Sequence, residues 1–159
     1  MTGSEFFQRL RREGRLKLIE PSEELKRAYL KKSESHLASA KLLLEHGKLE
    51  EAVSMTYYSM YHALTALLRR VGIKCENHAA SIILLKEIFG IDNSDITKAK
   101  RERIDKQYYL DFRIAREDVV ELIRIAESFN SRILDFTERL TSEKILRFRT
   151  RAKEVLEGK

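Results

Sequence analysis

The feature that most constrains the fold is a long run of apolar residues at helical spacing between residues 49 and 71, which contains neither Pro nor Gly. A helix with so wide an apolar face must be covered on several sides by other elements. We therefore predict a central helix from Leu49 to Val71, ended by Gly72. Its apolar positions are Val53, Tyr57, Met60, Tyr61, Leu64, Leu67, Leu68 and Val71.

Other segments share this periodicity, and capping residues or glycines stand between several of them. Ser4 and Ser22 are predicted N-caps of the first two helices. Residues 15–20 are expected to be a linker and residues 73–77 a loop. The additional helices are predicted over about 4–13, 22–46, 78–89, 94–109, 115–140 and 142–157. In the helix over 22–46, the predicted buried positions are Leu25, Ala28, Tyr29, Leu37, Ala40, Leu43 and Leu44.

The composition agrees with long helices. One Pro and six Gly are too few for the many tight turns of a β-sandwich or barrel, and 43% hydrophobic residues suffice for a core. We predict an all-α fold, an up-and-down bundle of four to five core helices with extra N- and C-terminal helices. Residues 1–20 would form an N-terminal helix and linker, 21–141 the bundle, and 142–159 a basic C-terminal helix.

The net charge of +6 is concentrated toward the two ends of the chain, and the middle is slightly acidic. Such an excess attracts phosphate-rich partners, although a solvated surface with many ion pairs produces the same pattern. The basic stretch over residues 144–153 either binds RNA or packs against the bundle or a second subunit.

Cys75 is the only cysteine, so no disulfide framework is expected, and a reducing cytoplasmic location fits. No apolar run approaches the roughly 20 residues that a membrane helix needs. A metal site built from Cys75, His62 and His78 lacks a carboxylate at regular spacing, so we expect no metal and no cofactor. Gly-rich phosphate loops of the Walker or Rossmann type are absent.

One polar stripe runs along the central helix. Tyr58, His62, Thr65 and Arg69 lie four, three and four residues apart, which places them on one side of a helix. Such a stripe either lines a ligand groove or presents the polar tips of otherwise packed side chains. Both interpretations stay open at this point.

The same helix carries a family resemblance. Tyr57-Tyr58-Ser59-Met60-Tyr61-His62-Ala63, followed by Leu67-Leu68, Gly72 and His78, resembles the second-helix signature of HEPN domains (higher-eukaryote and prokaryote nucleotide-binding domains). Residues 103–109 resemble the family's Arg-x-x-Ala-Asp-Tyr element, and residues 117–129 its last core helix. The resemblance covers roughly residues 25–135.

The resemblance implies a helical bundle that often dimerises and is often paired with a minimal nucleotidyltransferase in a toxin–antitoxin-like system. It also implies, for some members, a metal-independent ribonuclease with an Arg and a His contributed across a homodimer. Here Arg103 matches the family's Arg, but Lys106, Gln107 or Tyr108 stands where that His would follow.

Two hypotheses result. The first is a non-catalytic module that binds a nucleotide, RNA or a partner such as a nucleotidyltransferase. The alternative is a homodimeric ribonuclease in which His62, His78 and Arg103 are the catalytic candidates. The predicted ligand-binding residues are Tyr58, His62, Arg69, His78, Arg103 and Tyr108.

Overall fold

The computed structural model describes residues 3–108 and 113–158, with the side chains of 106–108 excepted. Within these ranges the chain forms seven helices and two short strands, which confirms the predicted all-α fold class. The elements are α1 (Gly3–Arg12), β1 (Leu16–Leu18), α2 (Glu23–Glu45), α3 (Leu49–Val71), β2 (Ile73–Cys75), α4 (His78–Phe89), α5 (Ser94–Tyr108), α6 (Arg116–Glu138) and α7 (Ser142–Leu156).

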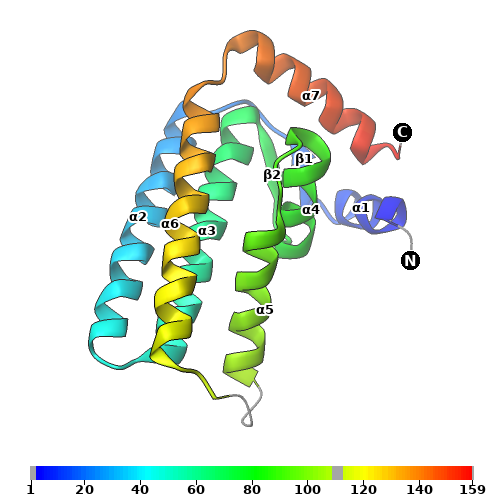
Figure 1. The fold of residues 1–159 in the computed structure, drawn as a ribbon. Coiled ribbons are helices and arrows are strands. Elements are labelled where there is room, and N and C mark those ends of the chain that lie inside the picture. The colour runs from blue at the N-terminus through cyan, green and yellow to red at the C-terminus, as the bar shows by residue number, and fades with distance from the viewer. Residues whose placement is uncertain (1–2, 109–112, 159) are drawn as a thin grey trace.

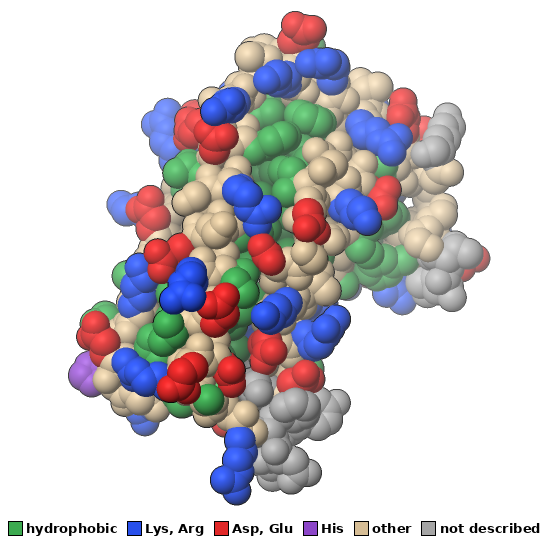
Figure 2. All heavy atoms as spheres, in the orientation of Figure 1, with side chains coloured by type: hydrophobic (Ala, Val, Ile, Leu, Met, Phe, Trp, Pro, Cys, Tyr) green, Lys and Arg blue, Asp and Glu red, His purple; other side chains and the backbone are tan. Residues whose placement is uncertain are grey.

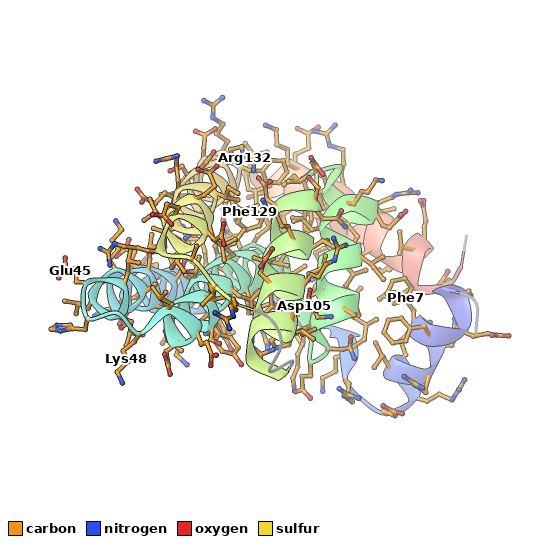
Figure 3. All side chains as sticks on the ribbon, turned by 60° about the horizontal axis from the view of Figure 1, so that its bottom comes forward. Phe7, Glu45, Lys48, Asp105, Phe129 and Arg132 are labelled. Carbon is orange, nitrogen blue, oxygen red and sulfur yellow. The ribbon has the colours of Figure 1, made fainter. Side chains whose placement is uncertain are left out.

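The central helix is α3, as its wide apolar face predicts. It packs against α2, α5 and α6, which run beside it as long rods in Figure 1. Tyr57, Met60 and Leu64 have no exposed surface. Figure 3 looks at the lower end of the bundle, where Glu45 and Lys48 mark the turn between α2 and α3 and Asp105 lies on α5. Among the described helices, none combines the length and apolar character needed to cross a bilayer.

The predicted buried stripe of α2 is wrong in part. Leu25 is 37% exposed and Ala28 is also exposed, whereas Lys26 and Ser33 are both 4% exposed. The Ser33 hydroxyl donates to the Ser59 carbonyl and the Ser59 hydroxyl donates to the Ser33 carbonyl, each at 2.7 Å. Small polar residues therefore bring α2 and α3 close together, and apolar periodicity cannot reveal such a contact.

The strands correct a second expectation, because the predicted linker and the predicted loop pair with each other. Leu16 lies opposite Cys75 and Leu18 opposite Ile73 in an antiparallel ladder. Leu16 and Ile73 point into the core. Strands of three residues are too short to show a period of two, and their pairing joins segments far apart in the sequence.

One arginine of α7 binds the end of α3 and the segment after β1. Arg149 Nη1 donates to the carbonyl oxygens of Ile19, Val71 and Gly72 at 2.7, 2.9 and 3.2 Å. Gly72 ends α3 with a φ of 87°, and a Cβ there would collide with the Ile19 carbonyl and with Arg149. The end of α3, the sheet and α7 are thus joined at a single point.

The helix starts follow local capping. Ser22 accepts a hydrogen bond from the Leu25 amide, as predicted, and Asn77 accepts one from the Ala80 amide. Ser4, in contrast, lies inside α1, which begins at Gly3, so its predicted capping role is wrong.

Candidate ligand-binding site

The polar stripe of α3 lies on one unbroken helix, since α3 extends from Leu49 to Val71 without interruption. Tyr58, His62 and Arg69 are half-buried, and Thr65 is buried with its hydroxyl donating to the Tyr61 carbonyl. The three half-buried side chains are therefore accessible in part, and each meets a different set of neighbours.

Toward α2, aromatic and cationic side chains form what we term the α2–α3 cluster. The ring of His62 lies 4.8 Å from that of His36 and stacks on Tyr29 at 5.9 Å between centroids. Lys32 Nζ and the Arg69 guanidinium each lie 5.8 Å from the centre of the Tyr29 ring. Cations over a tyrosine face are attracted by the negative face of its π-system.

His62 is held in its neutral form. Burial lowers its pKa to about 4, with His36 and Lys32 contributing in the same direction. Its buried Nδ1 has no hydrogen-bond partner, while His36 Nδ1 donates to the Lys32 carbonyl at 2.7 Å. An unpaired buried ring nitrogen is costly.

Toward α4 and α5, a second group forms what we term the α3–α5 cluster. The Tyr57 hydroxyl and His78 Nδ1 share a hydrogen bond of 2.7 Å, and the His78 ring stacks on Tyr61 at 3.8 Å. The Arg103 guanidinium lies 5.0 Å from the centre of the Tyr58 ring and 5.8 Å from that of Tyr57. These contacts fix His78 and place Arg103 across the tyrosines.

Burial and positive charge determine the protonation of this second cluster. Burial lowers the pKa of His78, and Lys100 and Arg103 lower it further. Burial also raises the pKa of Tyr57, so its hydroxyl stays protonated at neutral pH. The cluster therefore carries positive charge from Lys100 and Arg103, with a neutral imidazole between aromatic rings.

Tyr58 connects the two clusters, because its ring centroid lies 6.4 Å from those of both His36 and His78. Together they form a surface that we call the aromatic–cation face. Among the described residues no carboxylate forms an ion pair with Arg69 or Arg103, and the buried Nε of each has no hydrogen-bond partner. The face consists of Tyr29, Lys32, His36, Tyr58, His62, Arg69, His78, Lys100 and Arg103, with Tyr57 and Tyr61 buried beneath it.

A cavity of about 700 Å³ opens beside this face and reaches Tyr58 and Arg103. It does not include His62, His78 or Arg69. Its walls are mainly apolar with a few polar groups, as in sites for small organic ligands. It is lined by Ser39, Leu42, Leu43, Glu51, Ser54, Met55, Tyr58 and Arg103.

Five of the six predicted ligand-binding residues thus lie on one face, and the side chain of Tyr108 lies outside the described residues. The sequence reasoning missed three contributors from α2. Tyr29 was assigned to the core stripe, and Lys32 and His36 were not singled out. Their spacing of three and four residues puts all three on one side of α2, which was the available signal.

Metal ligands do not converge in the described part of the chain, where no group of three His, Cys, Asp or Glu side chains could hold an ion. Cys75 is buried, and burial raises the pKa of its thiol. His78 is instead engaged with Tyr57 and Tyr61.

Comparison with known proteins points to one family. The profile of the HEPN domain matches residues 26–156, a range that runs from α2 through α7. A UPF0332 protein of Pyrococcus horikoshii is 48% identical over 34% of this chain and 38% of its own length. A UPF0332 protein of Archaeoglobus fulgidus is 27% identical over 63% of this chain and 85% of its own length. A Methanocaldococcus jannaschii protein named "Putative toxin" is 30% identical over 67% and 84%, respectively.

Proposed function

The chain belongs to the HEPN domain family, and from that premise we propose that it is a non-catalytic module that binds nucleotide phosphates on its aromatic–cation face. The observation that carries this proposal is the position of Arg103. Its guanidinium rests on Tyr58 and Tyr57, its Nε is unpartnered, and no described carboxylate neutralises it. A preorganised arginine without a counter-ion is suited to a phosphate.

The neighbouring groups supply the other parts of a nucleotide site. Lys100 adds positive charge near Arg103, and the half-buried Tyr58 offers a ring on which a base can stack. The cavity beside Tyr58 is large enough for a base and sugar. Toward α2, Arg69 and Lys32 offer a second set of cations, where the next phosphate of an RNA strand would lie.

The neutral histidines support binding rather than turnover. With a pKa of about 4, His62 is almost fully unprotonated at neutral pH and is a weak general base. His78 is held by Tyr57 and Tyr61 and also has a lowered pKa. The imidazole of His62 is therefore not poised near neutrality for proton transfer in the free protein.

Titration calorimetry with mononucleotides and with a short single-stranded RNA tests the proposal and separates the two sources of phosphate. Arg103→Gln should weaken binding about tenfold, the usual loss for one charge-assisted contact. Arg101→Gln is the matched control, because Arg101 is an exposed arginine on the same helix. Absence of binding by every nucleotide and RNA, or equal loss in both variants, would refute the site.

We further propose a protein partner, a minimal nucleotidyltransferase, with which the chain would form a toxin–antitoxin-like pair. Membership in the HEPN family and the relative named "Putative toxin" support this proposal. Co-expression with a nucleotidyltransferase encoded beside the gene should give a complex that survives size-exclusion chromatography. Separate elution of the two proteins at micromolar concentration would count against it.

A second candidate function is the homodimeric ribonuclease. It is favoured by the closeness of His78 and Arg103, which both contact Tyr57. A bound phosphodiester would raise the histidine pKa, so that imidazole and guanidinium could serve as acid/base and phosphate anchor. RNA cleavage in the presence of EDTA, lost in His78→Ala or His62→Ala, would establish this activity. Light scattering on the same samples tests the homodimer, and intact RNA with a monomeric protein would exclude this alternative.

A further inference from the structure

A second concave surface lies in the angle between α6 and α7, away from the aromatic–cation face. It is a cleft of about 740 Å³. Figure 2 shows hydrophobic side chains gathered there with lysine and arginine side chains around them. We call this surface the elbow cleft. Its lining residues are Ile88, Ile91, Arg132, Asp135, Phe136, Arg139, Leu140, Lys144, Arg147, Phe148 and Arg151.

The floor of the elbow cleft is apolar and built on three packed rings. The rings of Phe136 and Phe148 lie 5.7 Å apart, and each lies within 6 Å of Phe89, at 5.9 and 5.0 Å respectively. Ile88 of α4 and Leu140, in the turn between α6 and α7, complete this floor. Covering such a patch with another apolar surface is favourable, because it removes apolar area from water.

The rim carries five cations against one carboxylate, and the cations stand on both walls. Arg132 and Arg139 are partly neutralised, since they pair with Asp95 and Asp135 at 2.8 and 3.1 Å. On the α7 wall, the exposed side chains of Lys144 and Arg147 form no ion pair with a described carboxylate. The cleft therefore has a net positive potential over an apolar floor.

Helical spacing makes both walls regular. On α6, Arg132, Phe136 and Arg139 recur at four and three residues, and on α7, Lys144, Phe148 and Arg151 recur at four and three residues. On each side of the cleft, a phenylalanine ring that contributes to the floor therefore lies between two cations of the rim. A helix laid along such a groove contacts it through its own residues at three- and four-residue spacing.

We propose that the elbow cleft is a docking site for an acidic amphipathic helical segment of a partner protein. Such a segment has an apolar ridge that fills the floor and carboxylates on both sides of the ridge that meet the two walls. RNA fits this surface less well, because its phosphates would pair with the rim while its polar backbone covered Phe136 and Phe148. A small inorganic anion could pair with the rim but would leave the apolar floor uncovered.

Selection from a display library of 16-residue helical peptides tests this proposal with the whole chain as bait. Enriched peptides should carry apolar residues at three- and four-residue spacing flanked by Asp or Glu. The consensus peptide should bind at least about tenfold more weakly to the double variant Lys144→Glu and Arg147→Glu. The neutral pair Lys144→Gln and Arg147→Gln should show a smaller loss, which guards against a folding defect in the first variant.

The matched control reverses two exposed lysines on α2 and the α2–α3 turn, Lys31→Glu and Lys48→Glu, and so changes the net charge equally. Its affinity for the consensus peptide should stay within about twofold of the original. The proposal is overturned if no peptide is enriched or if the enriched peptides lack acidic residues. It is also overturned if the charge-reversed cleft variant and the charge-reversed control lose binding equally. Displacement of the peptide by a single-stranded RNA that binds the cleft more tightly would also overturn it.

Discussion

The aromatic–cation face and the elbow cleft are both basic, yet they present positive charge in different ways. On the face, Arg69 and Arg103 lie on tyrosine rings and form no ion pair with a carboxylate of the described residues. At the cleft, most of the arginines hold acidic neighbours, and the rings form the floor beneath them. Cations that are fixed over accessible rings suit a phosphate next to a base, whereas cations around an apolar floor suit an acidic amphipathic surface.

The comparison also shows that the net charge of a segment predicts its partners less well than the positions of its charged residues in the fold. Net charge alone favours polyanionic partners, and for the basic stretch over residues 144–153 the sequence left RNA binding and packing both open. In the fold, part of that stretch is structural. Arg149 donates hydrogen bonds to three backbone carbonyls, and Ile145 and Ala152 are buried. Within this stretch, Arg149 therefore serves packing, whereas we propose that Lys144 and Arg147 serve recognition.

The largest effect is expected from removing both arginines of the face. The double variant Arg69→Gln and Arg103→Gln should weaken binding of a uridine dinucleotide about 100-fold, since two charge-assisted contacts are lost. Binding of the acidic consensus peptide should not change. Fluorescence anisotropy with both probes measures the two effects, and parallel losses would show that the two surfaces are not independent.

A smaller effect on stability is expected at the point that holds α7. Arg149→Ala removes hydrogen bonds to three carbonyls and should lower the free energy of unfolding by about 2 kcal/mol. Because α7 forms one wall of the elbow cleft, peptide binding should weaken while dinucleotide binding persists. Urea unfolding gives the first quantity, with the exposed Lys153→Ala as the control. An unchanged midpoint would mean that the Arg149 hydrogen bonds make no net contribution to stability.

Stacking on the face should contribute less than its charges. Tyr58→Leu should weaken dinucleotide binding by about 1 kcal/mol, because a base loses its aromatic platform. Tyr58→Phe should retain the affinity, since the ring and not the hydroxyl is required. If Tyr58→Phe binds as poorly as Tyr58→Leu, the Tyr58 hydroxyl contributes to binding and the proposed base stacking is wrong.

The smallest effect is a pH dependence that only the face should show. Burial holds the pKa of His62 near 4, and a bound phosphodiester would raise that value. Dinucleotide affinity should therefore rise a few-fold as pH falls from about 7 to about 5, since protons bind more readily to the complex. His62→Gln should remove this rise. A flat profile in the original chain would place the phosphate away from His62.

Acidification also has an opposite consequence for folding, which sets the range of that experiment. The folded pKa of His62 lies below its ordinary value of 6.5, so the unfolded chain binds the proton more readily. The corresponding contribution to stability is complete above pH 6.5 and declines as pH falls toward 4. Circular dichroism at each pH therefore has to accompany the binding measurements.

Particular residues show how far sequence reasoning reached. The bounds of α3 and α4 match their predictions, because Gly72 and Gly90 end these helices in the left-handed region and Asn77 caps α4. Tyr58, His62 and Arg69 were grouped correctly, since helical phase alone places them together. Tyr29 was misassigned to the core because an amphipathic ring at an apolar position satisfies the same periodicity.

The sequence by itself determined the helices, the Ser22 cap of α2 and the polar stripe of α3, because each depends on residues within a few positions of one another. Only the tertiary structure decided that Tyr29 and His36 join His62, that Arg103 lies over Tyr58, and that α6 and α7 enclose a cleft. It also decided the pairing of β1 with β2. These contacts join segments distant in the chain, and burial and close packing select them rather than any local pattern.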